Sequence, residues 1–220
     1  MSRLGLESFV LGEMDTNCYL LWCEDTRQAV VIDPADAGES IAEEILARQL
    51  QPMAILLTHG HFDHVLGSLA LQLSFDIPIY LHPDDNFLLA KAQSSAEYWL
   101  KHPVDPVPEA NHALADGQVI RFGECSLRVI HTPGHTPGSC SFLYTPEEAP
   151  DANEQFVFSE MPYLFDGDVI FKEGIGRTDF KYSKKNQLYK SFQLIKDLGT
   201  TRIFPGHGES FVSSDQEILS

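Results

Sequence analysis

Three histidines and one aspartate, placed directly after an apolar strand, restrict this chain's fold more than any other segment. The run MAILLTH is typical of a buried strand and leads straight into THGHFDH at 58–64. Alternate side chains of a strand project to the same side, so His59 and His61 can face one point. The turn that follows lets Asp63 and His64 face a neighbouring point. One short loop at a sheet edge can therefore serve two metal ions.

Three further candidate ligands stand at the ends of later predicted strands. His135 lies in HTPGHTPG, Asp168 in FDGDVIF and His207 in FPGHGES. In each segment a glycine or proline interrupts the strand beside the candidate, as expected where the backbone turns sharply at a rim. Because strand ends converge in space even when they are far apart in sequence, we expect these three side chains to join the cluster at 58–64.

The ligand types indicate which ions such a cluster would hold. Imidazole nitrogen and carboxylate oxygen suit zinc, iron or manganese, and two such ions about 3.5 to 4 Å apart can share a carboxylate. Asp168 is the natural bridge, and Asp63 and Asp168 are the candidate catalytic carboxylates. A water on such ions can ionise with a pKa of roughly 7, which gives a nucleophile without a serine or cysteine. We therefore predict two divalent metal ions, zinc first, with iron or manganese as alternatives.

The remaining histidines lack partners at ligand spacing. His82, His102 and His112 stand apart, and His131 lies on the strand before the ligand-bearing turn, so we expect an ordinary structural role for all four. Asp33, in VIDPA, has two interpretations. It can orient the histidine loop through a backbone group or a histidine, or it can simply belong to a turn at a strand end.

Apolar periodicity predicts one α/β domain with strands in both halves of the chain. Strands are expected at residues 6–11, 18–23, 29–34, 53–59, 77–83, 118–122, 126–132, 139–145, 163–170 and 202–207. Helices are expected at 39–49, 65–73, 86–101 and 184–197. Two segments are expected to lie at the surface, namely a long connection at 102–118 and an acidic, proline-containing insertion at 145–162.

Composition narrows the choice of partners. The 220 residues, 43% of them hydrophobic, suffice for one domain, and the formal charge of −17 disfavours a nucleic-acid partner. The N-terminus has no basic region followed by an apolar stretch, as an export signal would, and the sequence has no apolar run of about 18 residues. We therefore expect a cytoplasmic protein without a membrane span. The four cysteines form no CxxC pair and are interpreted as buried small residues rather than disulfides or zinc ligands.

The segments THGHFDH, GHT, GDVIF and PGHG together resemble the metallo-β-lactamase superfamily along nearly the whole chain. This resemblance implies a four-layer αββα sandwich, with two sheets packed face to face and the ions at one edge. It also implies two ligand sets, with His59, His61 and His135 on one ion, Asp63, His64 and His207 on the other, and Asp168 bridging them.

Within that superfamily, GDVIFKEGIGRTDF followed by a helix that contains Leu-Tyr is similar to small glyoxalase II-type enzymes. The likeness implies hydrolysis of a hydroxyacyl-glutathione or a related small-molecule thioester by a metal-held hydroxide. Full-length glyoxalase II proteins carry a further C-terminal helical region that contacts glutathione, whereas this sequence ends soon after His207. Lys172, Arg177 and Tyr163 are the candidate substrate-binding residues.

Other activities of the superfamily remain as alternatives. GIGRTDF also resembles persulfide dioxygenases, in which two histidines and one aspartate hold a single iron that activates oxygen. The complete second ligand set favours the binuclear hydrolase. The acidic composition disfavours a nuclease, and the missing export leader disfavours a β-lactamase. A non-enzymatic binding module or a flavodiiron-like electron-transfer module is a further alternative, which is disfavoured because 220 residues hold no appended flavin domain.

Overall fold

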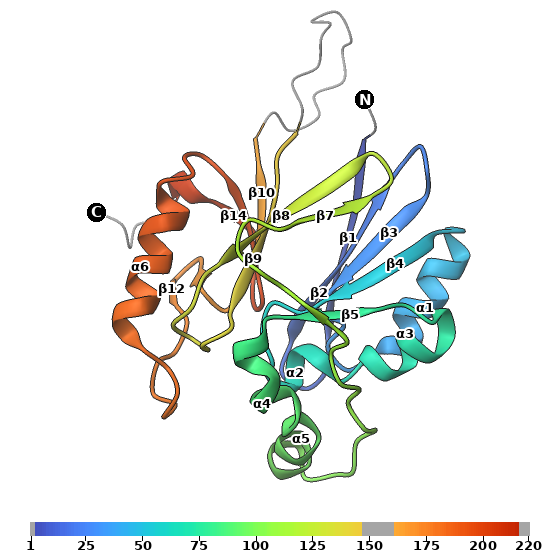
Figure 1. The fold of residues 1–220 in the computed structure, drawn as a ribbon, viewed down its shortest axis with the longest axis horizontal. Coiled ribbons are helices and arrows are strands. Elements are labelled where there is room, and N and C mark those ends of the chain that lie inside the picture. The colour runs from blue at the N-terminus through green and yellow to red at the C-terminus, as the bar shows by residue number, and fades with distance from the viewer. Residues whose placement is uncertain (1–2, 147–160, 216–220) are drawn as a thin grey trace, which may run out of the picture.

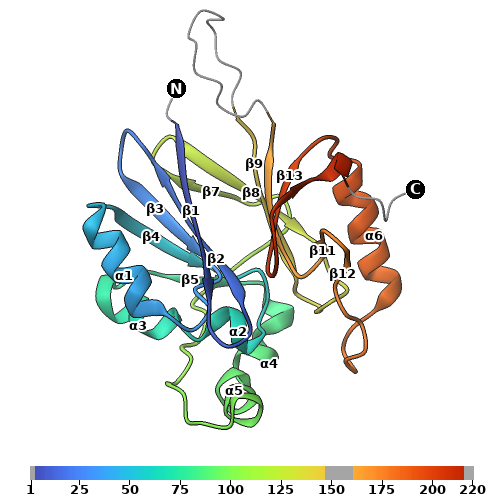
Figure 2. The same cartoon turned by 180° about the vertical axis from the view of Figure 1, so that it is seen from behind.

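The computed structural model describes residues 3–146 and 161–215, which form two six-stranded sheets packed face to face (Figures 1 and 2). The first sheet has the order β1 (Leu4–Leu11), β2 (Thr16–Cys23), β3 (Gln28–Ile32), β4 (Gln51–Leu56), β5 (Ile79–Leu81) and β6 (His112–Ala113). The second has the order β14 (Phe211–Val212), β13 (Arg202–Pro205), β10 (Tyr163–Gly167), β9 (Cys140–Tyr144), β8 (Cys125–His131) and β7 (Val119–Phe122). A small hairpin joins β11 (Ile170–Phe171) to β12 (Gly174–Ile175).

Helices cover the outer faces of both sheets (Figure 1). On the first sheet these are α1 (Gly38–Ala47) and α3 (Ser68–Phe75), while α6 (Lys185–Lys196) covers the second. Three short helices follow the loops at the lower edge in Figure 1, namely α2 (Phe62–Val65), α4 (Asn86–Leu89) and α5 (Ala92–Leu100). Single 3-10 turns occur at Pro83–Asp85 and Ser213–Asp215.

Within the described residues, three apolar cores lie between these layers. One packs α1 and α3 onto the first sheet, the second fills the space between the sheets, and the third packs α6 onto the second sheet. The middle core includes Leu21, Val30 and Leu56 from the first sheet and Phe122, Phe142 and Phe165 from the second. Three cores require four layers, so the predicted αββα sandwich is confirmed.

Strand β2 shows why the buried strands appear in the sequence as continuous apolar runs. All eight of its residues are buried. Cys18, Leu20 and Trp22 face the helices, whereas Tyr19 and Leu21 face the other sheet. A strand covered on both faces has no solvent side and therefore no alternation. The four cysteines are all buried and free, which confirms their interpretation as small core residues.

Several predicted boundaries are wrong, because tertiary contacts interrupt the periodic segments. The predicted helix at 65–73 is divided between α2 and α3 at Gly67, where an added Cβ would lie 2.5 Å from the carbonyl oxygen of Pro34. The predicted helix at 86–101 is likewise two helices, α4 and α5. The predicted strand at 163–170 ends at Gly167, whose φ of +56° turns the chain.

The two predicted surface segments fare differently. Residues 102–118 contain only the two-residue strand β6 and are otherwise a connection, as predicted. The central part of the predicted insertion, 147–160, lies outside the described residues.

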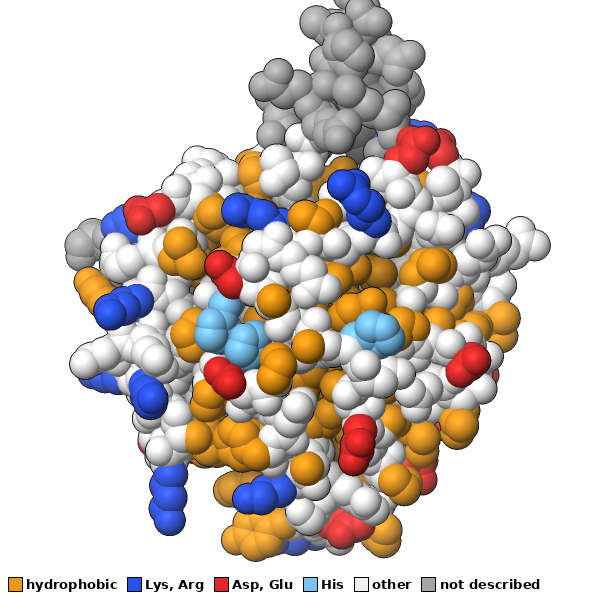
Figure 3. All heavy atoms as spheres, in the orientation of Figure 1, with side chains coloured by type: hydrophobic (Ala, Val, Ile, Leu, Met, Phe, Trp, Pro, Cys, Tyr) orange, Lys and Arg blue, Asp and Glu red, His pale blue; other side chains and the backbone are white. Residues whose placement is uncertain are grey.

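Figure 3 shows acidic and basic side chains scattered over one face, with histidines exposed in two places. Within the described ranges, no helix combines the length and apolar character needed to cross a membrane.

Candidate metal centre

The seven predicted ligands lie together where the loops of the two sheets meet. They are His59 and His61 after β4, Asp63 and His64 in α2, His135 between β8 and β9, Asp168 between β10 and β11, and His207 after β13. Hydrogen bonds between the sheets hold this edge closed. The Cys140 amide donates to the Thr58 carbonyl at 2.8 Å, and the Asn17 side-chain amide donates to the Pro205 carbonyl at 2.9 Å. The loops are therefore fixed by the sandwich itself.

One group of side chains directs three imidazole nitrogens at a common point. Nδ1 of His61 lies 2.9 Å from Nε2 of His59 and 3.0 Å from Nε2 of His135. Oδ2 of Asp168 lies 3.4 Å from Nε2 of His135. Three nitrogens and one oxygen at these separations can surround a single ion.

A second group lies beside the first and shares its aspartate. Oδ2 of Asp63 lies 3.4 Å from Nε2 of His64 and 3.3 Å from Nε2 of His207. Oδ1 of Asp168 lies 3.6 Å from the same atom of His64 and 3.8 Å from that of His207. The two oxygens of Asp168 therefore face different groups, as a bridging carboxylate would.

Every histidine of the cluster has a partner for its outer ring nitrogen. These partners are the Thr58 hydroxyl for His59 (3.0 Å), the Tyr182 hydroxyl for His61 (2.7 Å), the Asp33 carboxylate for His64 (2.9 Å), the Arg177 carbonyl for His135 (2.9 Å) and the Asp15 carbonyl for His207 (3.3 Å). In a neutral imidazole, an acceptor at the outer nitrogen places the proton there and leaves a lone pair on the inner one. The five rings are thus oriented as metal ligands are.

The buried polar atoms also fit a metal. Among the described residues, five buried side-chain atoms have no hydrogen-bond partner, and two of these are Nε2 of His64 and Oδ1 of Asp168. An unpaired buried polar atom is costly, whereas both atoms would be satisfied by coordination. The donor set of nitrogens and carboxylate oxygens therefore fits zinc, iron or manganese.

Protonation differs between the two groups. Burial, with the neighbouring histidines, holds the pKa of His59 well below its usual range, and burial followed by the charge of His135 lowers the pKa of His61 to about 3. Both rings are neutral at pH 7 and keep a lone pair for a metal. Burial opposes protonation of His64, but the nearby carboxylates outweigh it and raise its pKa to about 10. An ion that binds His64 must displace a proton.

Asp33 lies behind the centre and connects the two groups. Its carboxylate accepts the Thr58 amide at 2.8 Å, the Thr58 hydroxyl at 2.6 Å and Nδ1 of His64 at 2.9 Å. The same Thr58 hydroxyl is the partner of His59. Of the two interpretations of Asp33 in the sequence, the structure supports contact with a histidine.

Asp85 joins two ligand loops, and the sequence did not reveal it. Its buried carboxylate accepts the Gly60 amide at 3.0 Å, the Thr136 hydroxyl at 2.7 Å and the Gly138 amide at 2.7 Å. Gly60 stands between His59 and His61, and Thr136 follows the third histidine of that group. The available signal in the sequence was the glycines at 60 and 138, whose amides both donate to Asp85. Gly138 has no room for a side chain, because an added Cβ would lie 2.8 Å from Cγ of Asp85.

Of the candidate substrate residues, the structure brings two to the rim and one elsewhere. Arg177 is exposed, pairs with Asp179 at 2.6 Å and lies over the Phe180 ring. Lys172 is exposed and pairs with Glu209 at 2.7 Å. Tyr163 begins β10 at the end opposite Gly167 and packs, partly buried, against the middle core, so the structure does not bring it to the rim with the other two. A tyrosine beside an insertion gave no indication of which end of the strand faces the site.

Two other histidines come together away from the cluster. The rings of His82 and His131 stack with centroids 4.3 Å apart and planes 5° apart, near Asp84. Lone pairs in parallel ring planes do not converge on one ion, and Nε2 of His131 already lies 2.9 Å from the Pro137 carbonyl. His102 and His112 lie exposed elsewhere.

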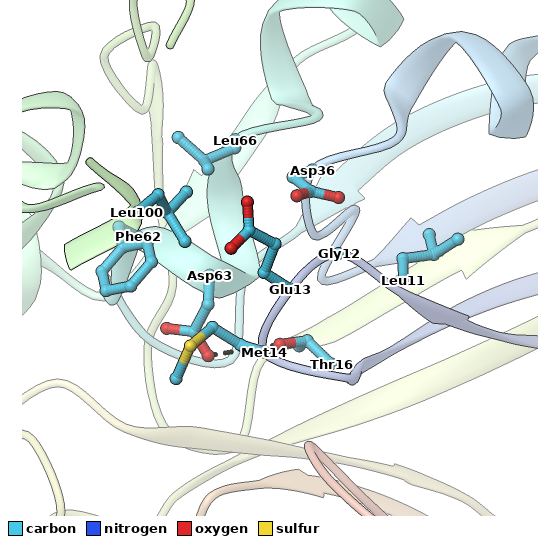
Figure 4. A pocket seen from close by; sticks show the side chains of 10 residues that line it. All are labelled: Leu11, Gly12, Glu13, Met14, Thr16, Asp36, Phe62, Asp63, Leu66 and Leu100. Atoms are coloured by element: carbon cyan, nitrogen blue, oxygen red, sulfur yellow. Dashed lines mark hydrogen bonds between the residues drawn. The ribbon is translucent and has the colours of Figure 1, made fainter. Parts of the chain in front are cut away.

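A small pocket opens beside Asp63 (Figure 4). The turn between β1 and β2 forms one wall with Glu13 and Met14, and Phe62 and Leu100 form the opposite apolar wall. The Thr16 hydroxyl donates to Oδ2 of Asp63 at 3.2 Å. Asp63 is the member of the second group that lines this pocket.

Comparison with known proteins agrees with this geometry. The family model described as the metallo-beta-lactamase superfamily matches residues 11–147. Hydroxyacylglutathione hydrolase GloC of Haemophilus influenzae is 29% identical and covers 97% of this chain and 95% of its own. The crystal structure of the BLEG-1 B3 metallo-beta-lactamase is 32% identical with a TM-score of 0.83 and covers 98% of this chain and 100% of its own. The crystal structure of TTHA1623 in a di-iron-bound form is 31% identical with a TM-score of 0.78, and it covers 95% of this chain and 96% of its own. A four-layer fold, a histidine and aspartate cluster at its edge and these matches make the chain a member of the metallo-beta-lactamase superfamily.

Proposed function

We propose that this protein is a binuclear metal-dependent hydrolase of a hydroxyacyl-glutathione or a related small thioester. The observation that carries the proposal is the division of Asp168 between two ligand groups, with Oδ2 near His135 and Oδ1 near His64. A carboxylate placed in this way suits two ions at a short separation. Zinc, iron and manganese all accept this donor set, and the di-iron form of the similar TTHA1623 makes iron as relevant as zinc.

The chain's own residues hold and orient the reacting groups in this proposal. Two bound divalent ions would supply a water that ionises near neutral pH and a Lewis acid for the substrate carbonyl. Asp63 and Asp168 supply the negative charge of the ligand set, while the outer partners of the histidines fix the rings. A thiolate is a good leaving group, so the reaction has little need of a separate acid.

Relatives and rim residues support a thioester substrate. GloC, which is named a hydroxyacylglutathione hydrolase, aligns along nearly its whole length. Arg177 and Lys172 are proposed to contact carboxylates of the substrate, because both are exposed and follow Asp168 closely in sequence. Each would have to exchange its present acidic partner for the substrate.

The proposal is tested by thiol release from lactoyl-glutathione. Purified protein is reconstituted in parallel with zinc, iron and manganese, beside His59→Ala and Asp168→Ala variants whose folding is checked by circular dichroism. We expect rapid, metal-dependent release that both variants lose. No release from any fully metallated sample would contradict the proposal.

A β-lactam is the second candidate substrate, because the similar BLEG-1 structure is described as a B3 metallo-beta-lactamase. Hydrolysis of a chromogenic β-lactam by the same samples distinguishes the two substrates. Oxygen consumption with glutathione persulfide provides the third comparison, and it is expected to be absent because both ligand groups are complete.

A further inference from the structure

His61 differs from the other ligands in what holds its outer nitrogen. Its Nδ1 faces the cluster, and its Nε2 lies 2.7 Å from the hydroxyl of Tyr182. The outer nitrogens of the other four histidines face backbone carbonyls or the Thr58 and Asp33 side chains at the buried edge of the first sheet. Tyr182 instead comes from the rim segment between β12 and α6 and is only half-buried.

Aromatic contacts fix the position of the Tyr182 ring. It stacks on Phe180 with centroids 5.3 Å apart and planes 13° apart, and it meets Phe87 edge-on at 5.5 Å. The Phe180 ring centroid also lies 5.2 Å from that of His61, and the Arg177 guanidinium lies 4.4 Å from the centroid of the Phe180 ring. The hydroxyl is thus held at one place by rings that do not depend on it.

An imidazole that binds a metal through Nδ1 must carry its proton on Nε2. An acceptor at Nε2 fixes this tautomer, orients the ring and makes the ligand more basic. The phenol oxygen of Tyr182 is such an acceptor for His61. We propose that Tyr182 is a positioning residue that holds His61 in its metal-binding tautomer and orientation. This inference rests on the binuclear centre proposed above.

The geometry makes the effect specific to one ion. Tyr182 contacts His61, which belongs to the group of three imidazoles with His59 and His135. The outer nitrogens of His64 and His207 have different partners, and neither is Tyr182. Loss of the hydroxyl should therefore weaken the binding of one of the two ions and leave the binding of the other nearly unchanged.

The test uses Tyr182→Phe, which removes the hydroxyl and keeps the stacked ring. Stepwise zinc affinities of the full chain are measured by competition with a chromophoric chelator. We expect one of the two affinities to fall about 10- to 100-fold, which is the usual effect of losing such a partner. The matched control is Tyr189→Phe, because Tyr189 is 60% exposed on α6 and should change neither affinity.

Two readouts separate positioning from a general loss of structure. Thermal unfolding of the metal-free variant should match the wild type, and the visible spectrum of the cobalt-loaded variant should differ from it. Wild-type protein that binds two ions, with a Tyr182→Phe variant that binds both equally well, would overturn this inference alone. Wild-type protein that binds fewer than two ions would overturn the proposed function as well.

Discussion

At the scale of single residues, Asp33 connects both ligand groups, because its one buried carboxylate orients a histidine in each of them. It contacts His64 directly and His59 through the Thr58 hydroxyl. The Thr58 amide, the Thr58 hydroxyl and Nδ1 of His64 all donate to it, so a carboxylate satisfies them where an amide would present a competing donor.

The first prediction replaces this carboxylate. Asp33→Asn should weaken binding of both ions, by about 10- to 100-fold each, because the tautomers of His59 and His64 are no longer fixed. Chelator competition measures the two affinities, with Asp36→Asn at an exposed position as the control. Unchanged affinities in Asp33→Asn would show that Asp33 does not orient the ligands.

The second prediction concerns pH. Burial opposes the charge on His64, yet Asp63, Asp168 and Asp33 raise its pKa to about 10 in the metal-free protein, against about 6.5 in an unfolded chain. A pKa raised by folding stabilises the fold below the unfolded value, and this stability is lost as the pH rises from there through the folded pKa.

Urea unfolding of the metal-free protein tests this. The midpoint should fall between pH 7 and 10, and the fall should be smaller in His64→Gln. The same pH dependence in both proteins would contradict the assignment of the raised pKa to His64.

At the scale of elements, sequence reasoning succeeded where burial alone decides and failed where tertiary contacts decide. The apolar runs of β2 and β3 were predictable because both faces of each strand are covered. The two-residue strands β11, β12 and β14 carry no period at all. Asp85 could not be found in advance, since its partners Gly60 and Thr136 lie 25 and 51 residues away.

The grouping of the seven candidate ligands was predictable, because strand ends and their glycines place these side chains at one edge. Tyr182 was not, because its acceptor role depends on the path of the rim segment between β12 and α6.

The third prediction tests the close approach of the two ligand loops. Gly138→Ala should lower the free energy of unfolding by about 1–3 kcal/mol, because its Cβ would lie 2.8 Å from Cγ of buried Asp85. Gly174→Ala is the control, since nothing lies within 4 Å of an added Cβ there. Urea unfolding measures both, and equal small effects would show that the loops can separate without cost.

At the scale of the whole molecule, the centre lies at the seam between two sheets that are otherwise joined by the middle core. Ligands from both sheets meet there, so bound ions would connect the two halves of the sandwich. A ligand that binds only the folded chain stabilises it, by about 2.7 kcal/mol for one ion at a hundred times its Kd.

The fourth prediction follows from this linkage. Removing metal with a chelator should lower the Tm of the reconstituted protein by roughly 5–10 °C, given about 2–4 °C per kcal/mol in domains of this size. Differential scanning calorimetry with and without chelator measures the shift. An identical Tm would mean that no ion joins the sheets.

The central claim is that Asp168 bridges two ions, and anomalous diffraction from crystals of the zinc-loaded protein tests it most directly. The account predicts two zinc peaks about 3.5 to 4 Å apart, one on each side of the Asp168 carboxylate. A single peak, or two peaks that do not share Asp168, would contradict it.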